Sequence, residues 1–428
     1  MTTQDTNKDF SAFGFSAPIR HAIKQAGYQQ PTDVQVKAIP EILAGHDVLA
    51  GAETGSGKTA AFALPLLEKL IHQKREEGHY AAKGNHIRAL ILVPTRELAI
   101  QISDEITAYA VGTSPTIKAL GVFGGVKINL QMMALRGGAD VLVATPGRLL
   151  DLASKNAVKF NKLQTLVVDE VDRLVGEDFR EEIKEIVKLL PAKRQNLMFT
   201  ATFPESIRYL VRALLDHPVI IDIDPGEEVL IDQRLYTVNR ENKNELLAYF
   251  LNEFDWKQVL VFCSAKKSCD NLVKKLEKRG IASVAMHGNK EQRNRAAALR
   301  GFKEGSIRVL VATDVAARGL DIEQLPCVFN FELPRSPKDY IHRIGRTGRA
   351  GESGTAISLI AHHEYAHFSV IEKHNDIRLK RESIEGFEAD AEAPEPIKNK
   401  PKKKKPKKLS KKRRQRLLDK KKTQMSDS

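Results

Sequence analysis

The sequence predicts an α/β protein with two tandem domains, each built on a parallel sheet flanked by helices, and a basic C-terminal tail. Short apolar, β-branched runs alternate with amphipathic stretches of helix length. Strands that are apolar throughout indicate a sheet covered on both faces. The chain has 428 residues, which suits two domains and an extension better than one domain.

The expected strands fall into two groups. The first half contains five, at residues 46–52, 88–95, 139–145, 163–170 and 196–202, and the second half contains four, at 258–264, 281–288, 308–314 and 355–360. An acidic stretch with a Pro-Gly turn separates the groups between Asp222 and Gln233. We therefore predict a lead-in over 1–26, a first domain over 27–222, a second over 233–380 and a disordered tail over 388–428.

The positive charge of the chain is concentrated in the tail. Between Lys398 and Lys422 there are 16 basic residues and one acidic residue, a net charge of +15, against +14 for the whole chain. The remainder is therefore close to neutral. A lysine-rich segment without aromatic residues cannot fold alone. It either keeps the protein in solution or attracts nucleic-acid phosphates without sequence preference.

Several classes of protein are disfavoured. No apolar run approaches the roughly 20 residues that span a bilayer, and the first ten residues are polar. The three cysteines, Cys263, Cys269 and Cys327, form no CxxC pair, which argues against a zinc site or a disulfide framework. We expect free thiols and a cytoplasmic protein that does not associate with membranes.

The segment AETGSGKT, Ala52 to Thr59, follows an expected strand and begins an expected helix. A glycine-rich turn at this place lets backbone N–H groups surround phosphates, while a lysine adds charge and a hydroxyl ligates Mg²⁺. We predict binding of ATP and Mg²⁺, with Lys58 at the phosphates and Thr59 at the metal. The predicted nucleotide-binding residues are Thr54, Gly55, Ser56, Gly57, Lys58 and Thr59.

The segment VVDEVDR, Val167 to Arg173, ends an apolar run with two acids and adds a third. Beside a phosphate loop, Asp169 is suited to the Mg²⁺ and Glu170 to activating the attacking water. Asp172 is better placed to connect this loop to another one. The alternative is a strand end that is acidic by chance.

These motifs, with others from about Phe10 to Ile360, resemble the DEAD-box RNA helicases. GYQQPTDVQ, Gly27 to Gln35, is similar to the adenine-recognition motif of that family. The resemblance implies two RecA-like domains, an adenine edge recognised by Gln35, and a ring stacked on Tyr28 with Phe10 upstream. Ala52 matches the family's form of the phosphate loop.

Two motifs depart from the family pattern. Val171 replaces the alanine of the D-E-A-D motif, and we expect its two additional methyl groups to crowd the acids without abolishing activity. TAT, Thr200 to Thr202, stands in place of SAT and keeps both hydroxyls. The resemblance implies that Thr200 and Thr202 couple hydrolysis to unwinding.

In the second half, VATDVAARGLDI and HRIGRTGR are similar to two further family motifs. By this resemblance Arg346 and Arg349 are arginine fingers that stabilise the transition state of phosphoryl transfer. Asp314 and Gly319 are nucleotide contacts. His342 joins Asp172, Thr200 and Thr202 in coupling the domains.

The resemblance also implies an RNA-binding set of residues. It is carried by PTRELA (residues 94–99), a glycine pair, TPGR (residues 145–148) and the threonine before Asp314. Hydroxyls, helix-start amides and a few arginines suit sugar-phosphate contacts, so we expect weak sequence preference. The predicted RNA-binding residues are Arg96, Gly124, Gly125, Thr145, Arg148 and Thr313.

The leading hypothesis is an ATP-dependent RNA helicase that unwinds or remodels RNA duplexes and ribonucleoproteins locally. One alternative is an ATP-gated RNA clamp or assembly scaffold with little productive unwinding, and another is a DNA helicase, which recognition of the 2′-hydroxyl would distinguish. The short lysine-rich tail resembles that of bacterial members acting on ribosomal RNA or pre-ribosomal particles. We expect a monomer.

Overall fold

The computed structural model describes residues 9–53, 55–77, 84–176, 179–201, 207–223, 231–317, 322, 325–348 and 354–390. It confirms the predicted fold class, because these residues form two seven-stranded sheets in which every strand pair is parallel. We call residues 9–223 the first lobe and residues 231–389 the second lobe. The predicted tail beyond residue 390 lies outside the described residues.

The first lobe contains strands β1 to β7. Their bounds are Val48–Gly51, Ile87–Leu92, Ala119–Val122, Ala139–Ala144, Thr165–Val168, Gln195–Thr200 and Val219–Asp222. A 3-10 helix, η1, spans Phe10–Phe13. Helices α1 to α9 span Ala17–Gln25, Asp33–Ala44, Lys58–Glu76, Arg96–Tyr109, Ile128–Ala134, Pro146–Ser154, Val171–Leu174, Arg180–Leu189 and Ile207–Leu214.

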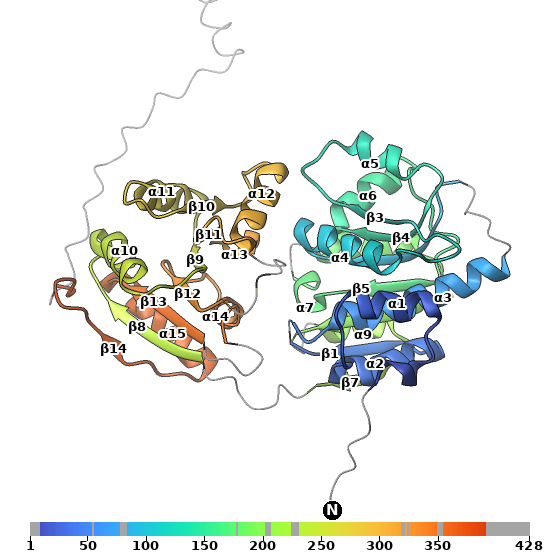
Figure 1. The fold of residues 1–428 in the computed structure, drawn as a ribbon, viewed down its shortest axis with the longest axis horizontal. Coiled ribbons are helices and arrows are strands. Elements are labelled where there is room, and N and C mark those ends of the chain that lie inside the picture. The colour runs from blue at the N-terminus through green and yellow to red at the C-terminus, as the bar shows by residue number, and fades with distance from the viewer. Residues whose placement is uncertain are drawn as a thin grey trace, which may run out of the picture. The chain divides into compact units, whose positions relative to one another are not determined.

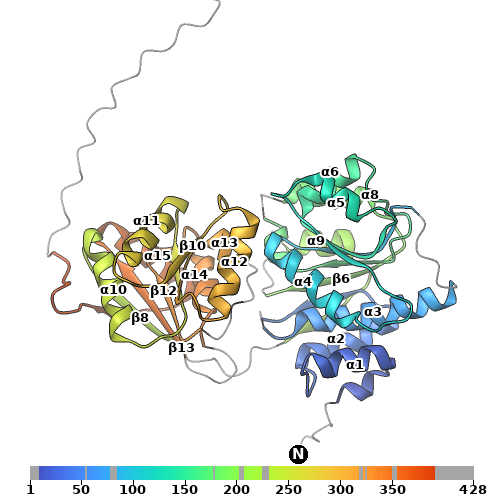
Figure 2. The same ribbon diagram turned by 45° about the horizontal axis from the view of Figure 1, so that its top comes forward.

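Successive side chains of β2 pack against opposite faces of the first sheet, and both faces are covered by helices. Ala89 and Ile91 belong to one apolar cluster with α1 to α4, whereas Leu90 and Leu92 belong to another with α6 and α8. Figures 1 and 2 show helices on both faces of each sheet. A strand buried on both faces is apolar at every position, which is the pattern that the sequence carried.

The second lobe contains strands β8 to β14. Their bounds are Ile231–Thr237, Val259–Cys263, Ser283–Met286, Val309–Thr313, Cys327–Asn330, Gly354–Ile360 and Arg381–Glu382. Helices α10 to α15 span Lys243–Glu253, Lys266–Glu277, Gln292–Lys303, Asp314–Ala317, Pro337–Ile344 and Tyr365–Asn375. Two 3-10 helices, η2 and η3, span Arg240–Asn242 and His362–Glu364.

The two sheets have the same strand order. The first is β3-β4-β2-β5-β6-β1-β7 and the second is β10-β11-β9-β12-β13-β8-β14. Numbered within its own lobe, each therefore follows the order 3-4-2-5-6-1-7. The similar rhythm of strands and helices in the two halves of the sequence reflects this shared topology.

All nine expected strands are present, and β3, β7, β8, β12 and β14 are additional. The missed strands include half-exposed ones: β7 has a run of only three apolar residues, and of its four residues only Ile221 is buried. The predicted lead-in contributes Phe10 of η1, Ile19 of α1 and Phe15 between them to the same apolar cluster as the first sheet. The three cysteines are buried free thiols, as expected.

Among the helices of the described residues, none combines the length and the apolar character required to cross a membrane.

Candidate active site

The phosphate loop connects β1 to α3. Gly55 and Gly57 adopt φ angles of 80° and 87°, a left-handed conformation that glycine tolerates without strain. α3 begins at Lys58, so its first N–H groups face the loop as an anion site requires. Thr54 lies outside the described residues.

Two carbonyl groups of the loop hold the lysine side chain. Lys58 Nζ donates hydrogen bonds to the carbonyl oxygens of Ala52 at 2.6 Å and Glu53 at 2.7 Å. Ser56 Oγ donates to Glu53 O at 2.7 Å. These bonds hold the Lys58 ammonium against its own loop.

The two acids of VVDEVDR lie at the carboxyl end of β5, next to the loop. Asp169 is only 4% exposed. Burial raises the pKa of its carboxyl to about 7, and the Lys58 ammonium opposes this shift. An aspartate this deeply buried beside a phosphate loop is suited to a cation, because the cation displaces the carboxyl proton.

Mg²⁺ fits the residues at this place. The Asp169 carboxylate and the Thr59 hydroxyl are hard oxygen donors that would hold it together with nucleotide phosphates. No cluster of three or more His, Cys, Asp or Glu that could hold a metal ion occurs in the described part of the chain. When bound, Mg²⁺ neutralises charge on the phosphate oxygens.

Glu170 is held in an unusual conformation. Its φ and ψ angles are both 50°, in the left-handed region, and its backbone N–H donates to Asp169 Oδ1 at 2.9 Å. The Arg173 guanidinium donates to Glu170 Oε2 at 2.6 Å, and both side chains are largely buried. The sequence reasoning gave Arg173 no role, although its spacing of three residues from Glu170 matches adjacent positions on a helical turn.

The predicted adenine end of the site is also assembled. The rings of Phe10 and Tyr28 stack with centroids 6.2 Å apart, and the hydroxyls of Tyr28 and Tyr109 are 2.7 Å apart. Gln35 closes a capping box at the start of α2, and its amide donates to Gly57 O at 3.1 Å. The glutamine thereby connects the adenine end to the phosphate loop.

Two of the predicted coupling residues are in contact. Thr200 Oγ1 donates to Asp172 Oδ1 at 3.1 Å, so the acidic loop after β5 is joined to the end of β6. Thr202 lies outside the described residues. Val171 is fully buried and belongs to the same apolar cluster as Leu174. Its expected effect on Asp169 and Glu170 stays a prediction.

Two second-lobe residues, His342 and Arg346, line the same cavity of about 370 Å³ as Lys58, Asp169 and Glu170. The predicted nucleotide contact Asp314 forms a bidentate ion pair with Arg343, whose Nε and Nη2 donate to its carboxylate at 2.6 and 2.8 Å. Arg343, which the sequence reasoning did not single out, therefore positions the Asp314 side chain. Gly319 and Arg349 lie outside the described residues.

The predicted RNA-binding residues of the first lobe form two groups. Arg96 lies against Gly124 and Gly125. Gly125 has a φ of 84°, which favours glycine, and a Cβ there would displace the Arg96 guanidinium. Arg148 is buried and donates to Gln131 Oε1 at 2.6 Å and Val126 O at 3.0 Å. Arg148 therefore holds the loop that follows the glycine pair.

Thr145 and Thr313 are both mostly buried at strand ends. Thr145 is the N-cap residue of α6, and Thr313 is the last residue of β11. Parallel strands end at one edge of each sheet, where ligands bind in proteins of this architecture.

Together, the fold and the site define the class of protein: a nucleotide hydrolase with a phosphate loop and two lobes of one topology. A model of the DEAD/DEAH box helicase family matches residues 32–210, and a model of the helicase conserved C-terminal domain matches residues 242–351.

Similar proteins were found among curated and solved ones. The chain is 38% identical to the ATP-dependent RNA helicase CshA of Listeria monocytogenes over 373 residues, which cover 87% of this chain and 69% of that one. It is 40% identical to the DEAD-box ATP-dependent RNA helicase RhpA of Helicobacter pylori over 374 residues, 87% and 73% of the two chains. The structure of Dbp5 from S. cerevisiae bound to RNA and ADP BeF3 matches with a TM-score of 0.73 and 28% identity, over 88% of this chain and 96% of that one.

The chain belongs to the DEAD-box family of ATP-dependent RNA helicases. It is an RNA-dependent ATPase, and the alternative of a clamp without productive unwinding is not favoured.

Proposed function

We propose that this chain hydrolyses ATP at the site built on Lys58, Asp169 and Glu170, and uses the cycle to separate short RNA duplexes locally. The observation that carries this proposal is the gathering of the phosphate loop, the buried acids, His342 and Arg346 around one cavity. Charge from both lobes can then act on one phosphoryl group.

Each residue has a distinct role in the proposed reaction. Lys58 binds phosphate oxygens after leaving the carbonyls of Ala52 and Glu53. Glu170 accepts the proton of the attacking water, and its ion pair with Arg173 fixes the direction in which the carboxylate points. Arg346, with Arg349, stabilises the charge that develops on the transferred group.

The RNA-binding and coupling roles belong to the same proposal. Arg96, with the Gly124–Gly125 turn, Thr145 and Thr313, contacts the sugar-phosphate backbone, while Arg148 supports that turn. The bond between Thr200 and Asp172 transmits the state of the nucleotide to the rest of the lobe.

The natural setting is part of the proposal as well. Its curated relatives named above are bacterial helicases, which supports action on structured RNA in the bacterial cytoplasm, with ribosomal RNA or pre-ribosomal particles as targets. We propose a monomer. Sedimentation of the pure chain tests the monomer, and cosedimentation with ribosomal precursors tests the target.

The primary experiment measures ATP hydrolysis without nucleic acid, with single-stranded RNA and with DNA of the same sequence. Release of a labelled strand from a short RNA duplex is followed in parallel. Stimulation by RNA alone together with ATP-dependent strand release is the expected result. Hydrolysis without strand release would contradict the unwinding activity, and equal stimulation by DNA would contradict the choice of RNA.

A further inference from the structure

The second lobe contains a cavity at the place where the first lobe has its nucleotide site. In each lobe the first strand of the sheet leads to a helix that begins with lysine: β1 to Lys58 of α3, and β8 to Lys243 of α10. Glu332 follows β12, the counterpart of β5, and so corresponds in place to the acids after β5. The cavity, of about 680 Å³, is lined by residues of both these segments. Its size is within the range of ligand pockets.

This cavity is not a second phosphate loop. The connection at residues 238–242 contains no glycine, so its backbone cannot wrap around phosphates as the first lobe's loop does. Lys243 is buried, and its Nζ donates to Phe331 O at 3.0 Å and to Glu364 Oε2 at 2.5 Å. These two bonds hold the Lys243 ammonium in the floor of the cavity.

The two acids of the cavity, Glu332 and Glu364, accept hydrogen bonds from other residues of the second lobe. Glu332 Oε2 accepts from Ser264 N at 2.7 Å and from Ser264 Oγ at 2.6 Å. Glu364 Oε2 accepts from Lys243 and from the Ala361 N–H at 2.9 Å. The charge of Glu364 is balanced by Lys243, and Glu332 keeps its negative charge, which is hydrogen-bonded within the lining.

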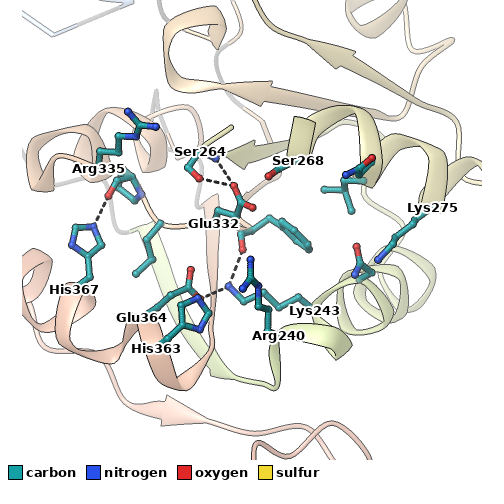
Figure 3. Close-up of a pocket in the computed structure, with 16 residues that line it drawn as sticks. Arg240, Lys243, Ser264, Ser268, Lys275, Glu332, Arg335, His363, Glu364 and His367 are labelled. Carbon is teal, nitrogen blue, oxygen red and sulfur yellow. Dashed lines mark hydrogen bonds and ion pairs between the residues drawn. The ribbon is translucent and has the colours of Figure 1, made fainter. Parts of the chain in front are cut away.

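Three exposed cations surround this floor and outweigh its net charge of about −1. Figure 3 shows Arg240, Lys275 and Arg335 on different sides of Glu332 and Lys243. No hydrogen bond or ion pair engages these three charged groups within the part of the chain that the structure describes. With four cations and two carboxylates the lining carries a net charge of about +2, and it presents its unpaired charge outward. Guanidinium and ammonium groups in such an arrangement suit phosphate oxygens.

The cavity lies next to a predicted RNA contact. Thr313 at the end of β11 pairs in register with Cys263 at the end of β9, and the next residue, Ser264, lines the cavity. Adjacent strands are about 4.8 Å apart, so the cavity begins roughly one strand away from Thr313. A strand of RNA that contacts Thr313 can reach the cavity by extending along the same edge of the sheet.

We propose that this cavity is an additional RNA-binding site, in which Arg240, Lys275 and Arg335 hold backbone phosphates of RNA beyond the segment that the predicted RNA-binding residues contact. The proposal rests on the RNA-binding function of the chain and extends it. The RNA contacts of the second lobe then occupy the position that ATP occupies in the first lobe.

The test compares two triple variants of the full chain. The cavity variant is Arg240→Ala/Lys275→Ala/Arg335→Ala. The matched control, Lys274→Ala/Lys278→Ala/Lys373→Ala, removes the same charge from exposed lysines of the same lobe outside the lining. The unfolding midpoint followed by the fluorescence of Trp256, the single tryptophan, establishes that both variants fold.

The dissociation constants for oligouridines of increasing length are measured by fluorescence anisotropy at several salt concentrations. For long RNA, the cavity variant is expected to bind about tenfold more weakly than the control, and its salt slope to be less steep by about 2, since each single-strand phosphate contact contributes about 0.7. For the shortest RNA that binds, the two variants are expected to agree.

Equal affinities of the two variants at every length would overturn the proposal. If inorganic tripolyphosphate then binds the wild type and not the cavity variant, the site takes a free anion and not RNA. If neither probe distinguishes the variants, an acidic protein segment becomes the better occupant. RNA-stimulated ATP hydrolysis by the wild type is measured separately, so failure of the proposed function is distinguishable from failure of this site.

Discussion

The two lobes share one strand order but use the same position in different ways. In the first lobe, the connection after the first strand is a glycine-rich loop with left-handed Gly55 and Gly57, and Lys58 can exchange loop carbonyls for phosphates. In the second lobe, the connection has no glycine, and the corresponding Lys243 forms a buried ion pair with Glu364.

The shared topology therefore puts equivalent positions at the edge of each sheet, and a few side chains determine the chemistry at each position. Asp169, the acid after β5, accepts a hydrogen bond from the Glu170 N–H, and burial raises its pKa to about 7. The pKa of Glu332, the acid after β12, is shifted in the opposite direction. Although burial raises the pKa of Glu332, hydrogen bonds from Ser264 and Ser268 lower it overall. One carboxyl is suited to receiving a cation, and the other to organising its own loop.

The largest expected effect distinguishes the catalytic acid from ordinary carboxylates. Glu170→Gln removes the proposed base, and kcat for RNA-stimulated ATP hydrolysis should fall by about 10³-fold. The control is Glu185→Gln, which changes an exposed carboxylate on α8 that pairs with Lys188. A loss of less than tenfold for Glu170→Gln would assign the base to another residue.

Lys243→Met should reveal the structural use of the second lysine. It leaves the carboxylate of Glu364 without its buried ammonium partner, so the free energy of unfolding of the second lobe should fall by about 3 kcal/mol. Urea unfolding followed by Trp256 fluorescence reports this lobe, because Trp256 packs in its core. Lys274→Met, on the exposed side of α11, is the control. The double variant Lys243→Met/Glu364→Gln should recover part of the loss, and no recovery would argue against the ion pair as the cause.

Val171→Ala tests whether the departure from the family motif acts on packing or on catalysis. Because Val171 is fully buried in the first lobe, the substitution should cost about 1.5 kcal/mol of stability there. ATP hydrolysis should remain within about twofold of the wild type. Circular dichroism should show an earlier urea transition while the Trp256 transition stays in place. A large change in kcat with unchanged stability would support crowding of the acids instead.

The smallest effect concerns the pH dependence of the second lobe. The lowered pKa of Glu332 means that its bonds to Ser264 stabilise the fold above about pH 4.5, the ordinary glutamate value, and that this contribution is lost as pH falls through the lowered pKa. Ser264→Ala should therefore cost about 1 kcal/mol at pH 7 and progressively less below pH 4.5. The unfolding midpoints of the wild type and the variant, followed by Trp256 fluorescence at pH 7 and below pH 4.5, measure this loss of stability. An equal loss at all pH values would mean that packing, and not the carboxylate, is responsible.

Much of the first site could be predicted from the sequence because its chemistry is local. The phosphate loop and the acids of VVDEVDR are short contiguous segments, and the apolar strands before them place both at one sheet edge. Arg343 and Arg173 were missed for a different reason. An arginine in an amphipathic stretch is indistinguishable from a solvated one until its partners, Asp314 and Glu170, are brought beside it.

The cavity of the second lobe could not be predicted at all. Its cations, Arg240, Lys275 and Arg335, are separated by up to 95 positions in the sequence and belong to no shared motif. The half-exposed strands β7 and β14 were likewise missed, since β7 has an apolar run of only three residues and β14 has none, and both are recognised by pairing with a neighbouring strand.

The fold class, the two lobes, the phosphate loop and the family follow from the amino-acid sequence, because periodicity and contiguous motifs act over short distances along the chain. The inward packing of Val171, the ion pair of Lys243 with Glu364 and the three distant cations around one cavity are visible only in the folded chain. Those features depend on which strand ends meet at a sheet edge, and that follows from the order of the strands in the sheet and not from any one segment.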